Sequence, residues 1–185
     1  MAFDEFGPFG HTYTSNRRWS DRYLPAAKRI IAEHILTEAP DALDMREATD
    51  LMMLDASTRR IAVRVRRPGY ANRYPYDITI RSGLPSGAET ELSKIVNGHG
   101  DWMLYGHACA DGIGLDRWWL LDLRAFRAAL IRRQGICSGE RVNHDGTRFR
   151  WFDVRSFPAE PQFVLAGSSQ APSENRPHLR KIFDH

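Results

Sequence analysis

The sequence contains little cysteine and lysine and no long apolar run. Cys109 and Cys137 are its only cysteines and form no C-x-x-C pair, which excludes a disulfide scaffold and predicts two free thiols. Together with His107 and His144 they also lack the paired spacing of a zinc site. No apolar run approaches the roughly 18 residues of a membrane span, and no basic region followed by an apolar one marks a secretory signal. We therefore expect a cytoplasmic protein with no membrane partner.

The composition is that of a folded domain. The chain has 185 residues, of which 42% are hydrophobic, 11% aromatic and 26% charged. This length suits one domain with one core, and the composition excludes a fibrous or wholly disordered chain. The sequence has no internal repeat, no Walker-type phosphate loop and no Ser/His/Asp pattern. It therefore gives no indication of a nucleotide hydrolase or a serine hydrolase.

Positive charge is concentrated in one segment. The formal net charge is only +3, from 26 Lys and Arg and 23 Asp and Glu. The segment from Arg59 to Arg81, however, holds seven arginines and a single acid. Such an excess attracts a phosphate backbone, because each neutralised phosphate releases counterions. A solvated basic face without a partner is the alternative, but the tyrosines interleaved with these arginines favour nucleic acid. They are Tyr70, Tyr74 and Tyr76.

The pattern of apolar, capping and turn-forming residues predicts an α/β (α+β) fold. We expect an N-terminal arm over residues 1–18, one domain over 19–166 and a flexible tail over 167–185. Helices are predicted at 20–37, 89–97 and 124–133, and strands at 49–55, 61–66, 76–81, 102–105, 118–123 and 148–154. Turn formers between the first two strands predict a hairpin. This order favours a mixed central sheet flanked by helices.

The strand at residues 61–66 alternates strictly between apolar and basic side chains. Because successive side chains of a strand point to opposite faces, Ile61, Val63 and Val65 lie on one face, and Arg64 and Arg66 on the other. We therefore expect the two guanidinium groups to lie side by side.

The segment T-D-L-M-M-L-D-A-S-T-R-R-I-A-V-R-V-R-R, residues 49–67, resembles a nuclease motif. An Asp that opens a strand, a turn, and a second strand with paired residues two apart are features of the PD-(D/E)XK nuclease superfamily, especially of its Holliday-junction-resolvase-like members. The resemblance covers residues 20–107 and implies a restriction-endonuclease-like core. Where that family has E-x-K, however, this chain has Arg64 and Arg66.

A second resemblance covers residues 45–157. The segments Ile78–Ser82 and Thr90–Gly106 are similar to conserved-looking blocks of a group of uncharacterised proteins that we expect to be phage-encoded. This resemblance implies a phage or mobile-element origin and brings no established function.

The nuclease resemblance implies an active enzyme only if its metal site is rebuilt. Phosphodiester hydrolysis needs an ion such as Mg²⁺ or Mn²⁺ held by at least two carboxylates, and the permanently charged Arg64 cannot replace one. Asp50 could be joined by Glu91 as the second metal ligand, with Lys94 on the same helix flank. Asp77, which opens the next strand, is the other candidate carboxylate. This hypothesis is a metal-dependent deoxyribonuclease.

Without a metal, we expect the protein to bind nucleic acid, and DNA rather than RNA, through its arginines. Guanidinium groups bind phosphate oxygens bidentately, and Arg64 and Arg66, joined by Arg67 and Arg81, would form a groove for the backbone. This first hypothesis needs no cofactor, and guanidinium groups paired with acidic neighbours would argue against it. A third hypothesis is an accessory module that binds another protein or forms a homodimer.

Overall fold

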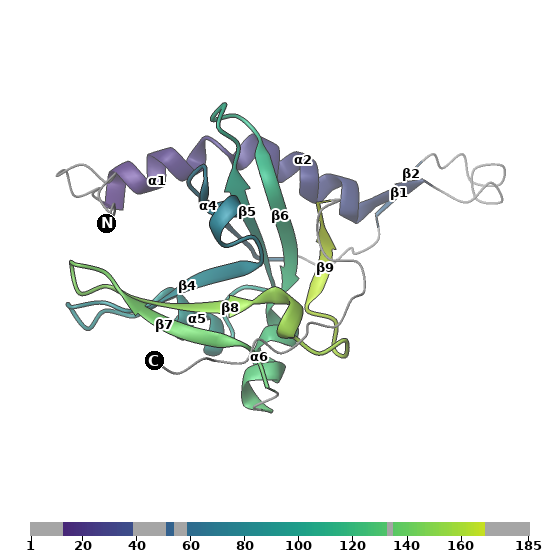
Figure 1. Ribbon diagram of the computed structural model, residues 1–185. Helices are drawn as coiled ribbons and strands as arrows, with labels where there is room; N and C mark the ends of the chain where they lie inside the picture. The colour runs from purple at the N-terminus through teal and green to yellow at the C-terminus, as the bar shows by residue number, and fades with distance from the viewer. Residues whose placement is uncertain (1–12, 39–50, 54–58, 133–134, 169–185) are drawn as a thin grey trace.

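The computed structural model describes residues 13–38, 51–53, 59–132 and 135–168 (Figure 1). The helices are α1 (Tyr13–Asp21), α2 (Leu24–Ile35), α4 (Tyr70–Arg73), α5 (Glu91–Val96) and α6 (Leu123–Ile131), with one 3-10 helix, η1 (Val154–Ser156). The strands are β1 (Leu36–Glu38), β2 (Leu51–Met53), β3 (Ile61–Arg66), β4 (Asp77–Gly83), β5 (Trp102–Ala108), β6 (Leu115–Asp122), β7 (Ser138–Val142), β8 (Arg148–Asp153) and β9 (Val164–Gly167).

A four-stranded sheet in the order β3-β5-β6-β9 forms the centre of the fold. β3 pairs with β5 in parallel, and the other two pairings are antiparallel. β5 is buried from Met103 to Ala108, because apolar clusters cover both of its faces. On the α2 side, Ala27 packs in one cluster with Leu104 and Leu120. β3 is the edge strand, and all of its residues remain partly exposed.

The second sheet has three antiparallel strands in the order β4-β8-β7. Ile78, Ile80 and Phe152 enter the larger apolar cluster, where they pack with Tyr105 of the first sheet and Phe126 of α6. Figure 1 shows the strands of the two sheets running in crossed directions, as in orthogonal sheet packing. The structure is therefore layered, with α1 and α2, the four-stranded sheet and the three-stranded sheet in succession.

The α+β character of the fold is as predicted, but the larger strands form two sheets rather than one central sheet. The strands predicted from residue 61 onward and the helices at 89–97 and 124–133 are found with shifted ends. α5, for example, begins after Thr90, whose hydroxyl accepts the amide of Ser93, and a left-handed Gly98 (φ +89°) follows it. Most of the helix predicted at 20–37 is found as α2, which begins after a turn at residues 22–23 and is followed directly by β1, while α1 includes residues 13–18 of the predicted arm.

The predicted hairpin between residues 49–55 and 61–66 is wrong. β2 pairs with β1, and β3 pairs with β5. The alternation and the turn formers correctly indicate strands. The pairing of β3, however, depends on burial against a strand that is distant in the sequence, and a local pattern does not reveal such a partner. The hairpin on which the nuclease resemblance rests is therefore absent from the described residues, and Asp50 lies outside them.

Two further expectations concern membrane spans and disulfides. No helix within the described ranges is long and apolar enough to cross a membrane. Cys109 is partly buried and Cys137 is exposed, and as predicted they are not joined in a disulfide.

Candidate nucleic-acid interface

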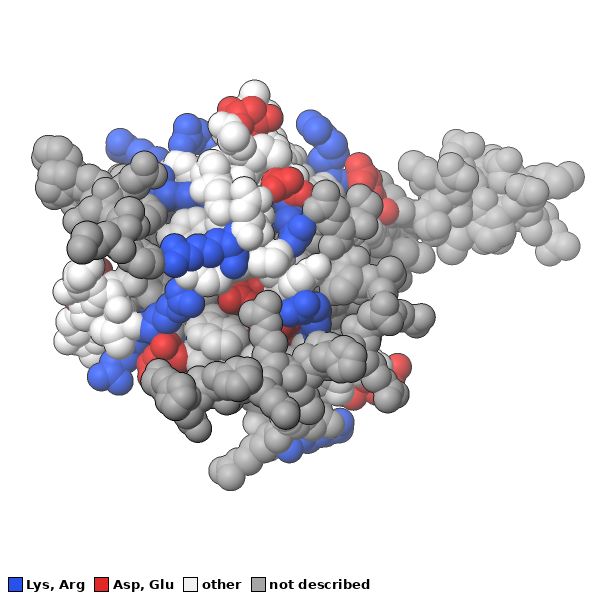
Figure 2. All heavy atoms as spheres, viewed as in Figure 1, with Lys and Arg blue, Asp and Glu red and all other residues white. Residues whose placement is uncertain are grey.

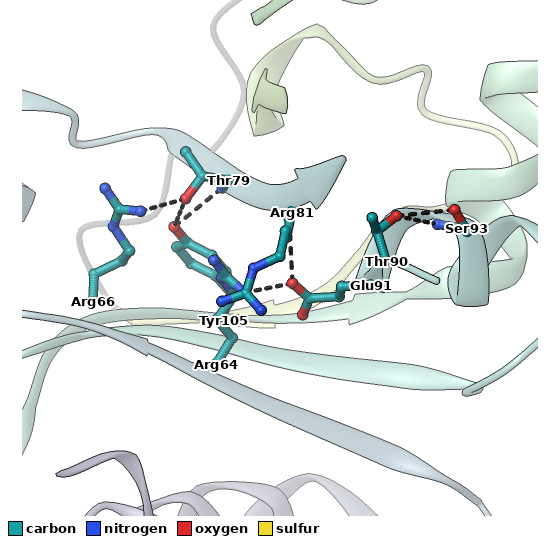
Figure 3. A network of polar contacts seen from close by, with 8 residues as sticks. All are labelled: Arg64, Arg66, Thr79, Arg81, Thr90, Glu91, Ser93 and Tyr105. Carbon is teal, nitrogen blue, oxygen red and sulfur yellow. Dashed lines mark hydrogen bonds and ion pairs between the residues drawn. The ribbon is translucent and has the colours of Figure 1, made fainter. Parts of the chain in front are cut away.

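β3 presents its arginines to the space between the two sheets. Along the strand, Val63 packs in the cluster beside α2, and Ala62 packs against the larger cluster between the sheets. Arg64 and Arg66 share the parity of Ala62 and therefore its face, and Figure 3 shows both pointing from β3 toward β4. The predicted division of this strand into an apolar and a basic face is confirmed.

Arg64 is paired with an acid from α5. Its Nη1 donates to Oε2 of Glu91, and the two side chains are only 21% and 28% exposed. The same oxygen accepts the backbone amide of Arg81 at 3.4 Å. The Arg64 and Arg81 guanidiniums lie 5.9 and 5.8 Å from the centre of the Phe149 ring. The carboxylate that the sequence indicated as a metal ligand is thus occupied by two donors of the protein.

Arg66 makes contacts of a different kind, with neutral partners. Its Nη1 donates to Oγ1 of Thr79 at 2.6 Å, and its guanidinium lies 4.2 Å from the centre of the Tyr70 ring. Thr79 is in turn held by the hydroxyl of the buried Tyr105, which lies 3.0 Å from Oγ1 and accepts the Thr79 amide at 3.1 Å. Arg66 therefore links β3 to both β4 and α4 without meeting an opposite charge in these contacts.

These interactions cover the open edge of β4. This strand has a neighbour on one side only, and an edge strand exposes amides that invite pairing with other chains. The amides of Thr79 and Arg81 bond to Tyr105 and Glu91 instead (Figure 3). Because Glu91 also holds Arg64, the ion pair joins the two sheets at this edge. Its position gives Arg64 a structural role.

Arg67 does not join the other predicted phosphate ligands. Arg67 is an odd number of residues from Arg64 and Arg66, so its side chain projects from the other face of the strand. Its guanidinium lies 4.9 Å from the ring centre of Trp19 in α1. The expectation of one groove lined by Arg64, Arg66 and Arg67 is therefore wrong, because strand alternation places Arg67 on the α1 side.

Asp50, which is common to both predicted metal pairs, lies outside the described residues, and the two carboxylates that could join it lie far apart from each other. Asp77 opens β4, whereas Glu91 contacts the amide of Arg81, four residues or about 13 Å along the strand. A shared ion needs each ligand oxygen within roughly 2.0 to 2.6 Å, so these two carboxylates cannot hold one ion together. Lys94 is exposed in the last turn of α5. Among the described residues, no group of three or more His, Cys, Asp or Glu is placed to hold a metal.

The three-stranded sheet adds residues that the sequence analysis did not assign to a site. Arg81, Phe149 and Arg141 lie opposite one another on β4, β8 and β7, and Trp151 lies opposite Gly139 one row away. Directly opposed residues project from the same face of a sheet. This face therefore carries arginines and aromatic rings together. The residues of β7 show no apolar alternation, so no periodic pattern predicts a strand at Arg141. The turn-forming residues 143–147 before β8 are the signal that could have located it.

The tyrosines of the α4 region connect this sheet face to β3. Arg141 Nη1 donates to the hydroxyl of Tyr74 at 2.8 Å and lies 4.7 Å from its ring centre. The Tyr74 and Tyr70 ring centres are 6.3 Å apart, and Arg73 lies 5.5 Å from the Tyr74 ring. We call the resulting surface the arginine–aromatic face. It consists of Arg66, Tyr70, Arg73, Tyr74, Arg81, Arg141, Phe149 and Trp151.

Figure 2 shows Lys and Arg side chains spread over this face of the molecule, with Asp and Glu among them. This side of the molecule therefore carries positive charge at further positions besides Arg64 and Arg66.

A buried histidine extends the row of Arg66 across the four-stranded sheet. His107 lies opposite Arg66 on β3 and Arg117 on β6, is 1% exposed, and has no hydrogen-bond partner on either ring nitrogen within the described residues. Burial, and then the charges of Arg66 and Arg117, lower the pKa of His107 to about 4. The ring is therefore neutral near pH 7, and the positive charge of this row comes from its arginines.

Comparison with protein-family models, with curated proteins and with solved structures finds no match to this chain. The functional interpretation therefore rests on the residues and their contacts.

Proposed function

We propose that this protein binds nucleic acid through the arginine–aromatic face. One observation carries the proposal: a continuous series of contacts that joins two guanidiniums through two aromatic rings. The Arg66 guanidinium lies 4.2 Å from the Tyr70 ring centre, the Tyr70 and Tyr74 ring centres are 6.3 Å apart, and the Arg141 guanidinium lies 4.7 Å from the Tyr74 ring centre. Guanidiniums bind phosphates and aromatic rings stack on bases, so a surface that combines the two suits both parts of a nucleic-acid strand.

Exposure to solvent decides which arginines we assign to phosphate. Arg73 and Arg141 are the exposed arginines of this face, and Arg141 contacts the neutral Tyr74. Arg66 and Arg81 are partly exposed beside them. Arg64 is left out, because its charge is compensated by Glu91. The proposal thus keeps the partner class expected from the sequence and moves the phosphate contacts from β3 toward α4 and β7.

Cleavage is not part of the proposal. A rebuilt nuclease site that uses Glu91 would need this carboxylate free for a metal ion, and it is bonded to Arg64 and to the amide of Arg81. The alternative site of Asp50 with Asp77 includes a residue outside the described ranges. A restriction-endonuclease-like core likewise gains no support from the pairing of β2 with β1. DNA remains the nucleic acid to test first, and a cytoplasmic location is consistent with such a partner.

Fluorescence anisotropy of a labelled DNA oligonucleotide, measured over a series of salt concentrations, tests the proposal. Replacing Arg73 and Arg141 together by Ala should weaken binding and reduce the slope of log K against log salt by about two, because two phosphate contacts are lost. The matched control is Arg29→Ala with Arg124→Ala, which removes two exposed arginines on α2 and α6.

The control pair should leave both affinity and slope unchanged. An equal loss in both double variants would mean that any surface arginine suffices, which contradicts the assignment to this face. Absence of salt-dependent binding by the unaltered protein would contradict the function itself.

A further inference from the structure

The Trp151 indole packs over Gly139 on the three-stranded sheet. A Cβ atom built on Gly139, its neighbour on β7, would come within 2.7 to 2.8 Å of indole atoms Nε1, Cε2 and Cζ2. Such approaches are closer than real Cβ atoms make, so the indole fills the space that a side chain at residue 139 would occupy. Gly139 is therefore what allows this ring to lie against the backbone of β7.

Trp151 differs from the other four tryptophans in its neighbours. A guanidinium lies over the rings of Trp19 and Trp102, whereas Trp118 and Trp119 make tilted or edge-on contacts with His34 and His107. Among the described residues, no ring or guanidinium makes such a contact with Trp151, and its side chain is partly exposed. A large, partly exposed apolar ring of this kind is suited to receive a planar group.

Basic groups lie on two sides of this ring. Thr79, opposite Trp151 on β4, holds the guanidinium of Arg66. In the next row of the same face, Phe149 lies between Arg81 and Arg141. A planar group on the indole would therefore have cationic donors near it in both directions, which is the arrangement that a nucleotide with flanking phosphates needs.

We propose that the arginine–aromatic face binds single-stranded nucleic acid, with one unpaired base stacked on Trp151 and the flanking phosphates near Arg66 and Arg141. This inference rests on the proposed function and specifies the form of nucleic acid that is bound. In a duplex the bases stack on one another and offer only their edges in the grooves. An indole held against a sheet cannot reach their faces, whereas a single strand exposes them.

The test compares a labelled 20-nucleotide oligothymidine with a labelled 20-base-pair duplex at one salt concentration. The unaltered protein should bind the single strand more tightly. Trp151→Ala should weaken single-strand binding roughly tenfold, because stacking of one base contributes on that order, and should leave duplex binding unchanged. Trp151→Phe should retain most of the affinity. Trp19→Ala, which removes the partly exposed indole of α1, is the matched control and should have no effect.

Gly139→Ala provides a second route that keeps the indole. Its new Cβ must displace the ring, so single-strand binding should fall while the tryptophan is still present. This variant decides the matter if Trp151→Ala lowers the melting temperature too far to measure binding. Full single-strand affinity in folded Gly139→Ala would overturn the inference.

The two proposals fail in different ways. If the duplex binds as tightly as the single strand, and Trp151→Ala changes neither while the Arg73 and Arg141 double variant still weakens both, the face binds nucleic acid but the single-strand inference is wrong. If neither probe binds, both proposals are wrong.

Discussion

Arg64, between the two sheets, and Arg141, on the arginine–aromatic face, differ in what neutralises them. Arg64 is 21% exposed and paired with Glu91, which also binds the amide of Arg81. Arg141 is exposed and bonds to the hydroxyl of Tyr74. A phosphate that competes for Arg64 must displace an acid, whereas one that approaches Arg141 meets a guanidinium held by a neutral partner. These two arginines therefore represent two populations in the fold, one structural and one available.

Lowering the pH should have the largest effect, a loss of folding stability that arises from the buried His107. Its pKa is about 4 in the folded protein, against an ordinary value of 6.5. Between these values the unfolded chain takes up a proton that the folded chain does not, so stability is lost as the pH falls from 6.5 to 4, by about 3 kcal/mol in total. Urea unfolding at several pH values measures this loss.

His107→Leu should flatten that pH dependence, because it removes the group that resists protonation. His99→Gln, which alters an exposed histidine, should preserve it. An unchanged dependence in His107→Leu would show that another group is responsible.

Removing Arg64 should separate the two populations by their effect on stability. Arg64→Ala leaves Glu91 partly buried without its cation, and we expect a loss of about 2 kcal/mol, between the effects for surface and buried pairs. Arg141→Ala should change stability by less than about 0.5 kcal/mol, since it is exposed. Urea unfolding compares the two. Adding Glu91→Gln to Arg64→Ala should recover part of the loss, and equal costs for the two single variants would remove the distinction.

The hydroxyl of Tyr105 should matter for the junction of the sheets and not for binding. Tyr105→Phe removes the group that accepts the Thr79 amide and should cost about 1 kcal/mol. Hydrogen exchange at the Thr79 amide should accelerate, while affinity for single-stranded DNA stays the same. Slow exchange at Thr79 in this variant would mean that the edge of β4 is protected by something else.

Of these variants, Glu91→Gln should have the smallest effect, a change in DNA affinity whose direction is the informative result. It keeps the shape of the side chain but removes the charge that neutralises Arg64, so DNA binding should tighten roughly threefold. If Glu91 were instead a metal ligand, the unaltered protein would cleave DNA with Mg²⁺ or Mn²⁺ and the variant would not. Anisotropy and a cleavage assay on the same preparations distinguish these results, and weaker binding by the variant would contradict its assigned role.

Much of the fold could be predicted because its signals are local. The alternation at residues 61–66 identifies β3 and divides its faces correctly, and Thr90 and Gly98 delimit α5. The partner of β3 could not be predicted, because it lies on a strand some 40 residues away in a sheet assembled by burial. β7 is not among the predicted strands, although the turn-forming residues Asn143–Thr147 precede β8 and a hairpin turn there implies a strand on its other side as well.

The site shows a similar limit. The sequence indicates Glu91 as a candidate metal ligand, and the resemblance sets Arg64 where the nuclease family has a carboxylate, but neither shows that the two side chains bind each other. Their pairing depends on where α5 packs against the sheets, a contact between distant segments. Parity alone, in contrast, would have separated Arg67 from Arg64 and Arg66, since it is an odd number of positions from each.

The central claim, that Arg141 contacts nucleic acid and Arg64 does not, is tested most directly by the salt dependence of DNA binding in Arg141→Gln and Arg64→Gln, each measured where the variant is fully folded. We predict that the slope of log K against log salt falls by about one in Arg141→Gln and stays unchanged in Arg64→Gln. A reduced slope in Arg64→Gln together with an unaltered slope in Arg141→Gln would contradict it.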